Sequence, residues 1–413
     1  MSPSEAPRPL WFEHITGLNQ TMLTTALLVM LTSAGFSIIL PFLPLYAESL
    51  GASSFEIGCM VAAYAVGSAL TSILGGWLAD RAGRKVSILV GLLIFSLATL
   101  LLGTVQTPIL FILFRFIEGA GFGFIYPAAN ALAQDLAPPE RLGQALGTYS
   151  TITLMGSFIG PAIGGFLSAS FGYTSTFLVI AGVTLVTAVL ASVLIREPTV
   201  SRDSTSTTQP RGKPTKFFLT PTLVIAYLGA SAVFFNNGFM QIVEVLYFST
   251  VLGASLTTIG IVFTGVALAT AVARIPAGWL IDHRGVKVVL VYGLALSGVF
   301  SALIVAMPNF WLAAISSAVG AFFGVMAFAA VPVIITREVP RAQRGRANGV
   351  LSILSSVGLI IGSPIGALLF GAYTPAPFLT TGVLFLIVSA VIALSFQQVT
   401  KPVVSNEVAQ QGL

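Results

Sequence analysis

Two opposite charges stand three residues apart in a long apolar stretch of the sequence. Arg115 and Glu118 are the two charged residues of the run Pro108 to Leu132. On an α-helix this spacing places both side chains on one face, where they can pair or share a water-filled cavity. Desolvation favours the neutral form of a carboxyl group, whereas a neighbouring arginine favours the charged form. Glu118 is therefore a candidate proton-coupling acid with Arg115 beside it, and a static ion pair is the structural alternative.

Two further charges interrupt apolar runs, at Glu244 and Arg274. An ionisable side chain at membrane depth costs roughly 2.5 to 3.5 kcal/mol on insertion scales, so each needs a partner, water or a function. Glu244 either serves a specific task or reaches water near the end of its run. Arg274 could meet a ligand or bridge helices. Polar or aromatic candidates for lining a cavity are Asn236, Asn237, Gln241, Tyr46, Tyr64 and Tyr126.

The chain that carries these residues is far more apolar than a soluble protein. Only 8% of its 413 residues are charged, against roughly 25% in soluble domains, while 56% are hydrophobic and the mean hydropathy is +0.96. Stretches of about 20 apolar residues, each long enough for one helical crossing of a bilayer, follow one another. We predict twelve transmembrane helices. They cover approximately 21–46, 55–79, 86–104, 108–132, 143–168, 173–195, 218–250, 256–281, 286–307, 310–336, 345–370 and 377–396.

The sequence contains an internal repeat. The passage from Gly76 to Lys85 returns, with substitutions, from Gly278 to Lys287, a shift of 202 positions that continues without a gap over a hundred residues. Two similar bundles facing each other are typical of membrane transporters. We therefore predict an all-α integral membrane protein with two pseudo-symmetric six-helix bundles. The expected parts are a tail (1–20), a bundle (21–196), a linker (197–217), a second bundle (218–397) and a tail (398–413).

The basic residues are distributed very unevenly along the chain. Seventeen of the 19 Lys and Arg residues fall in the tails, the linker or the loops that join even to odd spans. Because such residues stay on the cytoplasmic side, both termini are predicted to be cytoplasmic. The formal charge of +5 then reflects topology and attraction to anionic lipid headgroups, not binding of nucleic acid.

The repeated loop resembles the hallmark of the major facilitator superfamily. The match involves Gly76, Leu78, Asp80, Arg81, Gly83, Arg84 and Lys85. The resemblance implies a conformational latch, in which Asp80 faces the positive end of the eleventh helix and Arg84 pairs with Asp135. In the second copy Val286 replaces the arginine, so we expect Asp282 and Arg337 to form a substitute pair. Ordinary solvated turn charges are the alternative.

Two helix motifs add to this resemblance. The segment from Arg115 to Gly119 is similar to a motif of the family in which the arginine is associated with proton transfer, although Glu118 stands where glutamine is more common. A second segment resembles the motif that marks exporters exchanging substrate for protons, and its residues are Gly156, Gly160, Pro161, Gly164 and Gly165. Glycines four apart allow close helix packing, and such packing alone is the alternative.

The resemblance implies a drug:proton antiporter. We expect efflux of a lipophilic or amphipathic small molecule across the cell membrane by alternating access, driven by the proton gradient without a cofactor or a bound metal. The expected partners are the substrate, protons and membrane lipids, and the chain is expected to be a monomer. Alternatives are a lipid-linked glycan flippase, a proton-coupled uptake symporter, or a transporter-like receptor or assembly factor. No convergent nucleophile, acid and base indicate an enzyme.

Overall fold

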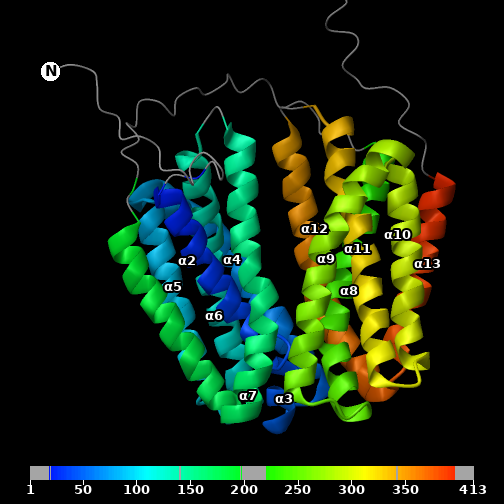
Figure 1. Ribbon diagram of the computed structural model, residues 1–413, viewed down its shortest axis with the longest axis horizontal. Helices are drawn as coiled ribbons and strands as arrows, with labels where there is room; N and C mark the ends of the chain where they lie inside the picture. The colour runs from blue at the N-terminus through cyan, green and yellow to red at the C-terminus, as the bar shows by residue number, and fades with distance from the viewer. Residues whose placement is uncertain are drawn as a thin grey trace, which may run out of the picture. The chain divides into compact units, whose positions relative to one another are not determined.

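A computed structural model describes residues 18, 20–138, 141–195, 197, 220–340 and 343–395, and within these ranges the chain is helical with no β-strand. Figure 1 shows long helices running alongside one another. Nearly all of the predicted N-terminal tail and linker and the whole predicted C-terminal tail lie outside the described residues, so those expectations stay predictions.

The helices of the first repeat alternate with short connections. They are α2 (Gln20–Ile39), α3 (Leu43–Ser49), α4 (Ser54–Ala82), α5 (Arg84–Leu102), α6 (Pro108–Leu136) and α7 (Leu142–Leu194). The predicted first span is divided into α2 and α3 because Pro41 lacks an amide hydrogen and Pro44 lies in the first turn of α3. The long α7 is two helices joined at Gly172, whose φ of 78° and ψ of 169° are not helical.

The helices of the second repeat follow the same order. They are α8 (Pro221–Leu246), which continues as a π-helical turn (Tyr247–Val251), α9 (Leu256–Arg284), α10 (Val286–Leu303) with a 3-10 turn (Ile304–Ala306), α11 (Phe310–Glu338), α12 (Arg344–Ala372) and α13 (Ala376–Ser395). In the described part of the chain, 11 helices are long and apolar enough to cross a membrane. Since α7 is two helices, the predicted twelve spans are confirmed.

Several helix starts repeat with the sequence. Ser53 and Ser255, which are 202 positions apart, precede α4 and α9; the amide of Ser53 donates to Glu56 at 2.8 Å, and Ser255 accepts from the amide of Thr258 at 3.2 Å. Gly83 and Gly285, with φ of 106° and 86°, start α5 and α10. Residues other than glycine rarely adopt such backbone angles. The repeat therefore includes the turns that set the direction of each helix.

Close backbone contacts hold equivalent helix pairs together. A Cβ atom on Gly156 or Gly164 of α7 would overlap a carbonyl oxygen of α2. On α12, a Cβ on Gly362 would overlap the Phe235 carbonyl of α8, and one on Gly366 would lie 2.6 Å from the Phe239 carbonyl oxygen. Small residues permit this approach, which replaces the hydrophobic effect as the source of helix association in lipid.

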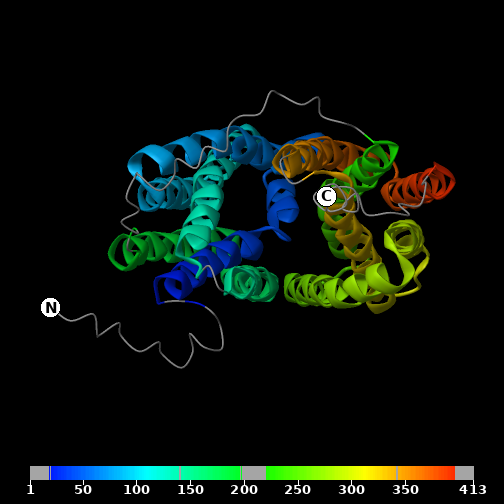
Figure 2. The same ribbon diagram turned by 90° about the horizontal axis from the view of Figure 1, so that it is seen from above.

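The chain forms two compact units. Unit 1 comprises residues 1–51 and 63–206, and unit 2 comprises residues 52–62 and 207–413. Figure 2 shows the same helices end-on. The first turns of α4 belong to unit 2, where a Cβ on Gly58 would overlap Pro364 of α12 and one on Gly371 would lie 2.5 Å from the Ser54 hydroxyl oxygen. Helix α4 therefore continues from one unit into the other.

Candidate functional site

Arg115 and Glu118 form an ion pair inside unit 1. The guanidinium of Arg115 donates to Oε2 of Glu118, and the two side chains are 2% and 0% exposed. The hydroxyl of Thr99 on α5 donates to the other carboxylate oxygen, Oε1, at 2.9 Å. Both oxygens of Glu118 are thus hydrogen-bonded. The pairing predicted from the spacing of three is present, and the role of the pair in proton transfer stays a prediction.

A group of aromatic rings extends from this ion pair. The Arg115 guanidinium carbon lies 4.6 Å from the ring centroid of Tyr64 on α4. The Tyr64 ring contacts Phe36 of α2 at 4.8 Å and Phe122 of α6 at 6.0 Å between centroids. Phe122 stacks on Tyr126 at 5.6 Å, and Tyr126 is 55% exposed. We call Phe36, Tyr64, Phe122 and Tyr126 the aromatic cluster; it connects the buried pair to the surface of unit 1.

Glycines bring α4 against α6 at this level. A Cβ atom on Gly119 would overlap the Tyr64 carbonyl oxygen, and one on Gly67 would overlap the Phe116 carbonyl oxygen. The Thr71 hydroxyl also donates to the Ala120 carbonyl at 2.8 Å. The close approach of the two backbones places the Tyr64 ring beside Arg115.

Glu244 has a different environment in unit 2. The residue is partly buried, and its carboxylate accepts a hydrogen bond from the hydroxyl of Ser317 on α11 at 2.9 Å. No ion pair involves Glu244 within the described ranges. On the same helix, Asn237 is exposed and Gln241 is partly buried, and within the described part of the chain the Asn236 side-chain oxygen is buried without a hydrogen-bond partner. The contact that the structure shows for the Glu244 carboxylate is therefore with a neutral hydroxyl.

Arg274 is exposed on α9, and no carboxylate in the described part of the chain forms an ion pair with it. Its neighbours Val272 and Ile275 are 57% and 77% exposed. Among the three tyrosines predicted to line a cavity, Tyr126 is exposed, whereas Tyr46 and Tyr64 are 7% and 8% exposed. Tyr46 lines a small pocket of unit 1, and its hydroxyl donates to the Val105 carbonyl at 3.3 Å.

The first latch loop is joined to α6 through Arg84. Its Nε donates to Asp135 at 3.2 Å, and its Nη1 donates to Asp80 and to the Ala79 carbonyl at 2.7 and 2.8 Å. The expected pairing of Arg84 with Asp135 is thus present. The expected position of Asp80 opposite the eleventh predicted span, which is α12 in the structure, concerns both units and stays a prediction.

The other residues of this loop have local roles. The Arg81 guanidinium carbon lies 4.7 Å from the ring centroid of Trp77. Gly83 supplies the positive φ that ends α4 and starts α5. Gly76 has open space where a Cβ would lie. The amide of Lys85 donates to a carboxylate oxygen of Glu197 at 3.0 Å.

The second copy of the loop lacks the expected ion pair. Asp282 and Arg337 are both described, and they form no salt bridge with each other. Arg344 instead satisfies the end of α11 by donating to the carbonyls of Thr336 and Val339 at 2.8 and 3.1 Å. The expected substitute pair is therefore wrong. Val286 has no charged group at the position of Arg84, the residue that joins the first loop to α6, and Arg344 binds the end of α11 through backbone carbonyls instead.

Sequence reasoning missed three partners in these sites. The hydroxyl of Thr99 donates to Glu118, and the hydroxyl of Ser317 donates to Glu244. The carboxylate of Glu197, in the predicted linker, accepts from the amide of Lys85. The sequence held a weak signal for Thr99 and Ser317, since each is a hydroxyl within an apolar span. No motif points to Glu197.

The exporter-like motif lies in the first part of α7. Gly156, Gly160 and Gly164 face α2: a Cβ on Gly160 would lie 2.7 Å from the Ser37 Cβ, and one on Gly156 or Gly164 would overlap backbone atoms. Pro161 and Gly165 are buried in the same segment. Equivalent contacts join α12 to α8. The geometry shows close packing in both repeats and leaves the direction of transport as a prediction.

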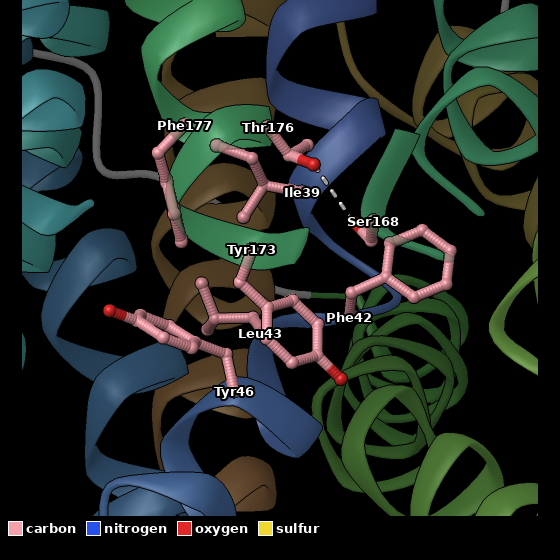
Figure 3. A pocket seen from close by; sticks show the side chains of 8 residues that line it. All are labelled: Ile39, Phe42, Leu43, Tyr46, Ser168, Tyr173, Thr176 and Phe177. Atoms are coloured by element: carbon pink, nitrogen blue, oxygen red, sulfur yellow. Dashed lines mark hydrogen bonds between the residues drawn. The ribbon is translucent and has the colours of Figure 1, made fainter. Parts of the chain in front are cut away.

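Unit 1 also has two small pockets away from the charged pair. One, shown in Figure 3, has side chains from α2, α3 and α7 converging on it, including Tyr46, Tyr173 and Phe177, and its Ser168 and Thr176 hydroxyls are 3.2 Å apart. The other is lined by residues such as Leu28, Ile88 and Ile125. Within the described ranges, no group of three or more His, Cys, Asp or Glu residues could hold a metal ion.

Repeated helical units with membrane-length helices and an ion pair buried in one of them define a multi-pass membrane transporter. The chain belongs to the Major Facilitator Superfamily, whose sequence profile matches residues 25–245 and 225–412. The multidrug resistance protein MdtG of Proteus mirabilis (strain HI4320) is 30% identical over 362 residues, which are 83% of this chain and 87% of that protein. The quinolone resistance protein NorA of Staphylococcus aureus (strain MRSA252) is 28% identical over 367 residues, 84% of this chain and 89% of NorA.

Solved structures agree on the fold. A bacterial homologue of the human lysosomal transporter Spinster, in an inward-facing and unoccupied conformation, has a TM-score of 0.75 at 18% identity and covers 91% of this chain and 96% of its own. The nucleoside transporter NupG has a TM-score of 0.70 at 13% identity, covering 91% of this chain and 100% of its own. At these identities the likeness concerns the architecture alone.

Proposed function

We propose that this transporter exports lipophilic or amphipathic small molecules in exchange for protons, by rocker-switch alternating access. The similarity to relatives named for multidrug and quinolone resistance extends over most of the chain. The single observation in the molecule that supports proton coupling is the Arg115–Glu118 pair, because it is an acid that is enclosed at membrane depth and held by one cation.

The chemistry of the pair suits a proton switch. An enclosed ion pair depends on the balance between desolvation and mutual attraction. Protonation of Glu118 would remove the attraction, release Arg115 from one of its partners and change the net charge of the site by one. An intramembrane ionisable residue with a named partner is a functional hypothesis by default.

The other predicted residues take supporting roles in this proposal. Glu244, Arg274, Asn236, Asn237, Gln241 and Tyr126 would contribute to the substrate cavity. Asp80, Arg84 and Asp135 would stabilise one conformation of the cytoplasmic loops. Gly156, Gly160, Pro161, Gly164 and Gly165 would maintain the packed surface of α7.

The energy source in this proposal is the proton gradient, without a cofactor. Each charge that moves across the membrane contributes about 2.3 kcal/mol per 100 mV. The protein would act as a monomer in the cytoplasmic membrane of a bacterium, with both termini in the cytoplasm and with lipids, protons and the substrate as its partners.

Inverted membrane vesicles with an imposed pH gradient test this function. Addition of a planar lipophilic cation such as ethidium should partly collapse the gradient in vesicles that contain the wild-type protein. The Glu118→Gln variant, which keeps the shape of the side chain but cannot ionise, should abolish this effect. Glu48→Gln is the matched control, because Glu48 is an exposed acid of unit 1. Compound-dependent proton movement that persists in Glu118→Gln would contradict the assigned coupling acid.

A further inference from the structure

Tyr64 is the third group of the buried pair, and its position is built into the fold. Its side chain is enclosed, with 8% of the residue exposed. Because a Cβ on Gly119 would overlap the Tyr64 carbonyl oxygen, the absence of a side chain next to Glu118 lets the α4 backbone lie directly against α6. The ring is thereby held against the Arg115 guanidinium, 4.6 Å from centroid to carbon.

The hydroxyl of Tyr64 is not what holds it there. In the described part of the chain, this oxygen is buried without a hydrogen-bond partner, and so is Nε of Arg115. The contact between the two residues is therefore made by the face of the ring. An aromatic face attracts a cation through the quadrupole of the ring, and the attraction grows when water is excluded.

The contact between Tyr64 and Arg115 matters because, within the described ranges, few other groups act on the Arg115–Glu118 pair. Arg115 on the same helix is the charged group that acts on Glu118, α5 contributes the neutral hydroxyl of Thr99, and α4 contributes the Tyr64 ring. Phe36 of α2 and Phe122 of α6 add apolar rings that contact Tyr64. While Glu118 is ionised, Arg115 has a full countercharge. Once Glu118 is protonated, the face of Tyr64 is the electrostatic partner that the described part of the chain provides for the arginine.

We propose that Tyr64 is a positioning residue of the proton-coupling pair, whose ring stabilises the Arg115 cation during the part of the cycle in which Glu118 carries the proton. This inference rests on the proposed function. The ring contacts also connect the pair to Phe122 and the exposed Tyr126. A planar substrate stacked on Tyr126 would therefore touch the same cluster of rings that holds Arg115.

The test is the pH profile of ethidium-dependent proton movement in inverted vesicles containing the full-length protein. Tyr64→Phe keeps the ring and should retain the wild-type profile. Tyr64→Leu removes the ring, which makes the protonated state harder to reach. We expect the pH of half-maximal exchange to fall by about one unit, which is a tenfold change in proton affinity. Tyr149→Leu is the control for general destabilisation, since Tyr149 is another buried tyrosine of unit 1, with its hydroxyl 3.4 Å from the Ala129 carbonyl oxygen.

Three results would overturn the inference. They are a wild-type profile in Tyr64→Leu, equal shifts in Tyr64→Phe and Tyr64→Leu, and a shift of the same size in Tyr149→Leu. If the wild-type protein moves no protons, the proposed function fails, and Tyr64 is tested directly on the purified protein. Infrared difference spectroscopy then follows the carboxylic acid band that is absent in Glu118→Gln. The pH at which this band appears should be lower in Tyr64→Leu than in the wild type, and an unchanged pH would refute the role of the ring.

Discussion

Glu118 in unit 1 and Glu244 in unit 2 are both carboxylates within apolar helices, yet their surroundings differ. Glu118 is fully enclosed, with a guanidinium on one oxygen and a hydroxyl on the other. Glu244 is less buried, and in the part of the chain that the structure describes its carboxylate contacts the Ser317 hydroxyl, not a cation. The helices around them repeat, including caps, turns and packing glycines. The repeat thus supplies a common framework, and each half holds its charges in its own way.

The largest difference between the halves should come from breaking the ion pair. Arg115→Ala leaves a buried, uncompensated carboxylate, and loss of one partner of such a pair typically costs about 3 to 5 kcal/mol. Ser317→Ala removes one hydrogen bond from a partly exposed acid and should cost about 1 kcal/mol. Thermal unfolding of the purified proteins in detergent compares the stability losses of the two variants. Equal losses in both variants would contradict the distinction between the two acids.

The same pair can be replaced to separate stability from coupling. Apolar residues of similar size in place of a buried ion pair are often neutral or stabilising. The double variant Arg115→Met, Glu118→Leu should therefore recover most of the stability lost in Arg115→Ala and still fail to exchange protons. A double variant that exchanges protons at the wild-type rate would show that the pair is structural.

In contrast to the two acids, the packing glycines of the two repeats should be equivalent, so that Gly→Ala changes cost equal stability in both halves. Gly164→Ala and Gly366→Ala place a Cβ against backbone atoms of α2 and α8, and overpacking of this kind costs about 1 to 3 kcal/mol. The controls are Gly147→Ala and Gly349→Ala, also 202 positions apart, where nothing lies within 4 Å of the new Cβ. These should gain up to about 1 kcal/mol from helix propensity. Thermal unfolding of all four variants tests the equivalence, which a loss confined to one repeat would refute.

Arg84 in the first latch loop and Arg344 at the start of α12 should differ in their response to salt. Arg84 donates to two carboxylates and one carbonyl, whereas Arg344 donates to two carbonyls. These groups are partly exposed, so each Arg→Ala change should cost about 1 kcal/mol at low salt. In 1 M salt, screening should shrink the cost of Arg84→Ala more than that of Arg344→Ala. Parallel salt dependence in unfolding experiments would contradict the assignment of Arg84 to ionic contacts and of Arg344 to neutral ones.

The sequence predicted the framework and the contacts that helical spacing or a family motif indicates. The twelve spans, the repeated turns, the Arg115–Glu118 pair and the contact of Arg84 with Asp135 all follow from hydropathy, from helical spacing or from resemblance to a family. The partners missed were Thr99, Ser317 and Glu197, which are 19, 73 and 112 residues from the groups they contact. These contacts depend on how each helix is rotated about its axis, and apolar runs with little amphipathic pattern carry no such information. Asp282 and Arg337 show the converse: opposite charges at matching positions of a repeat do not ensure an ion pair.

The smallest expected effect concerns Glu197, which distinguishes the starts of α5 and α10. The Glu197 carboxylate accepts from the Lys85 amide at 3.0 Å and occupies the space beside Gly83 at the start of α5, and α10 begins after Gly285 in the equivalent turn. An anion at a helix N-terminus satisfies free amides and complements the helix dipole. Glu197→Ala should therefore speed hydrogen exchange at the first amides of α5 by about two- to fivefold, and Glu197→Gln by less. Exchange at the start of α10 should not change, and Glu48→Ala serves as the control. Faster exchange at the start of α10, or an unchanged exchange rate at the start of α5, would mean that Glu197 does not cap α5.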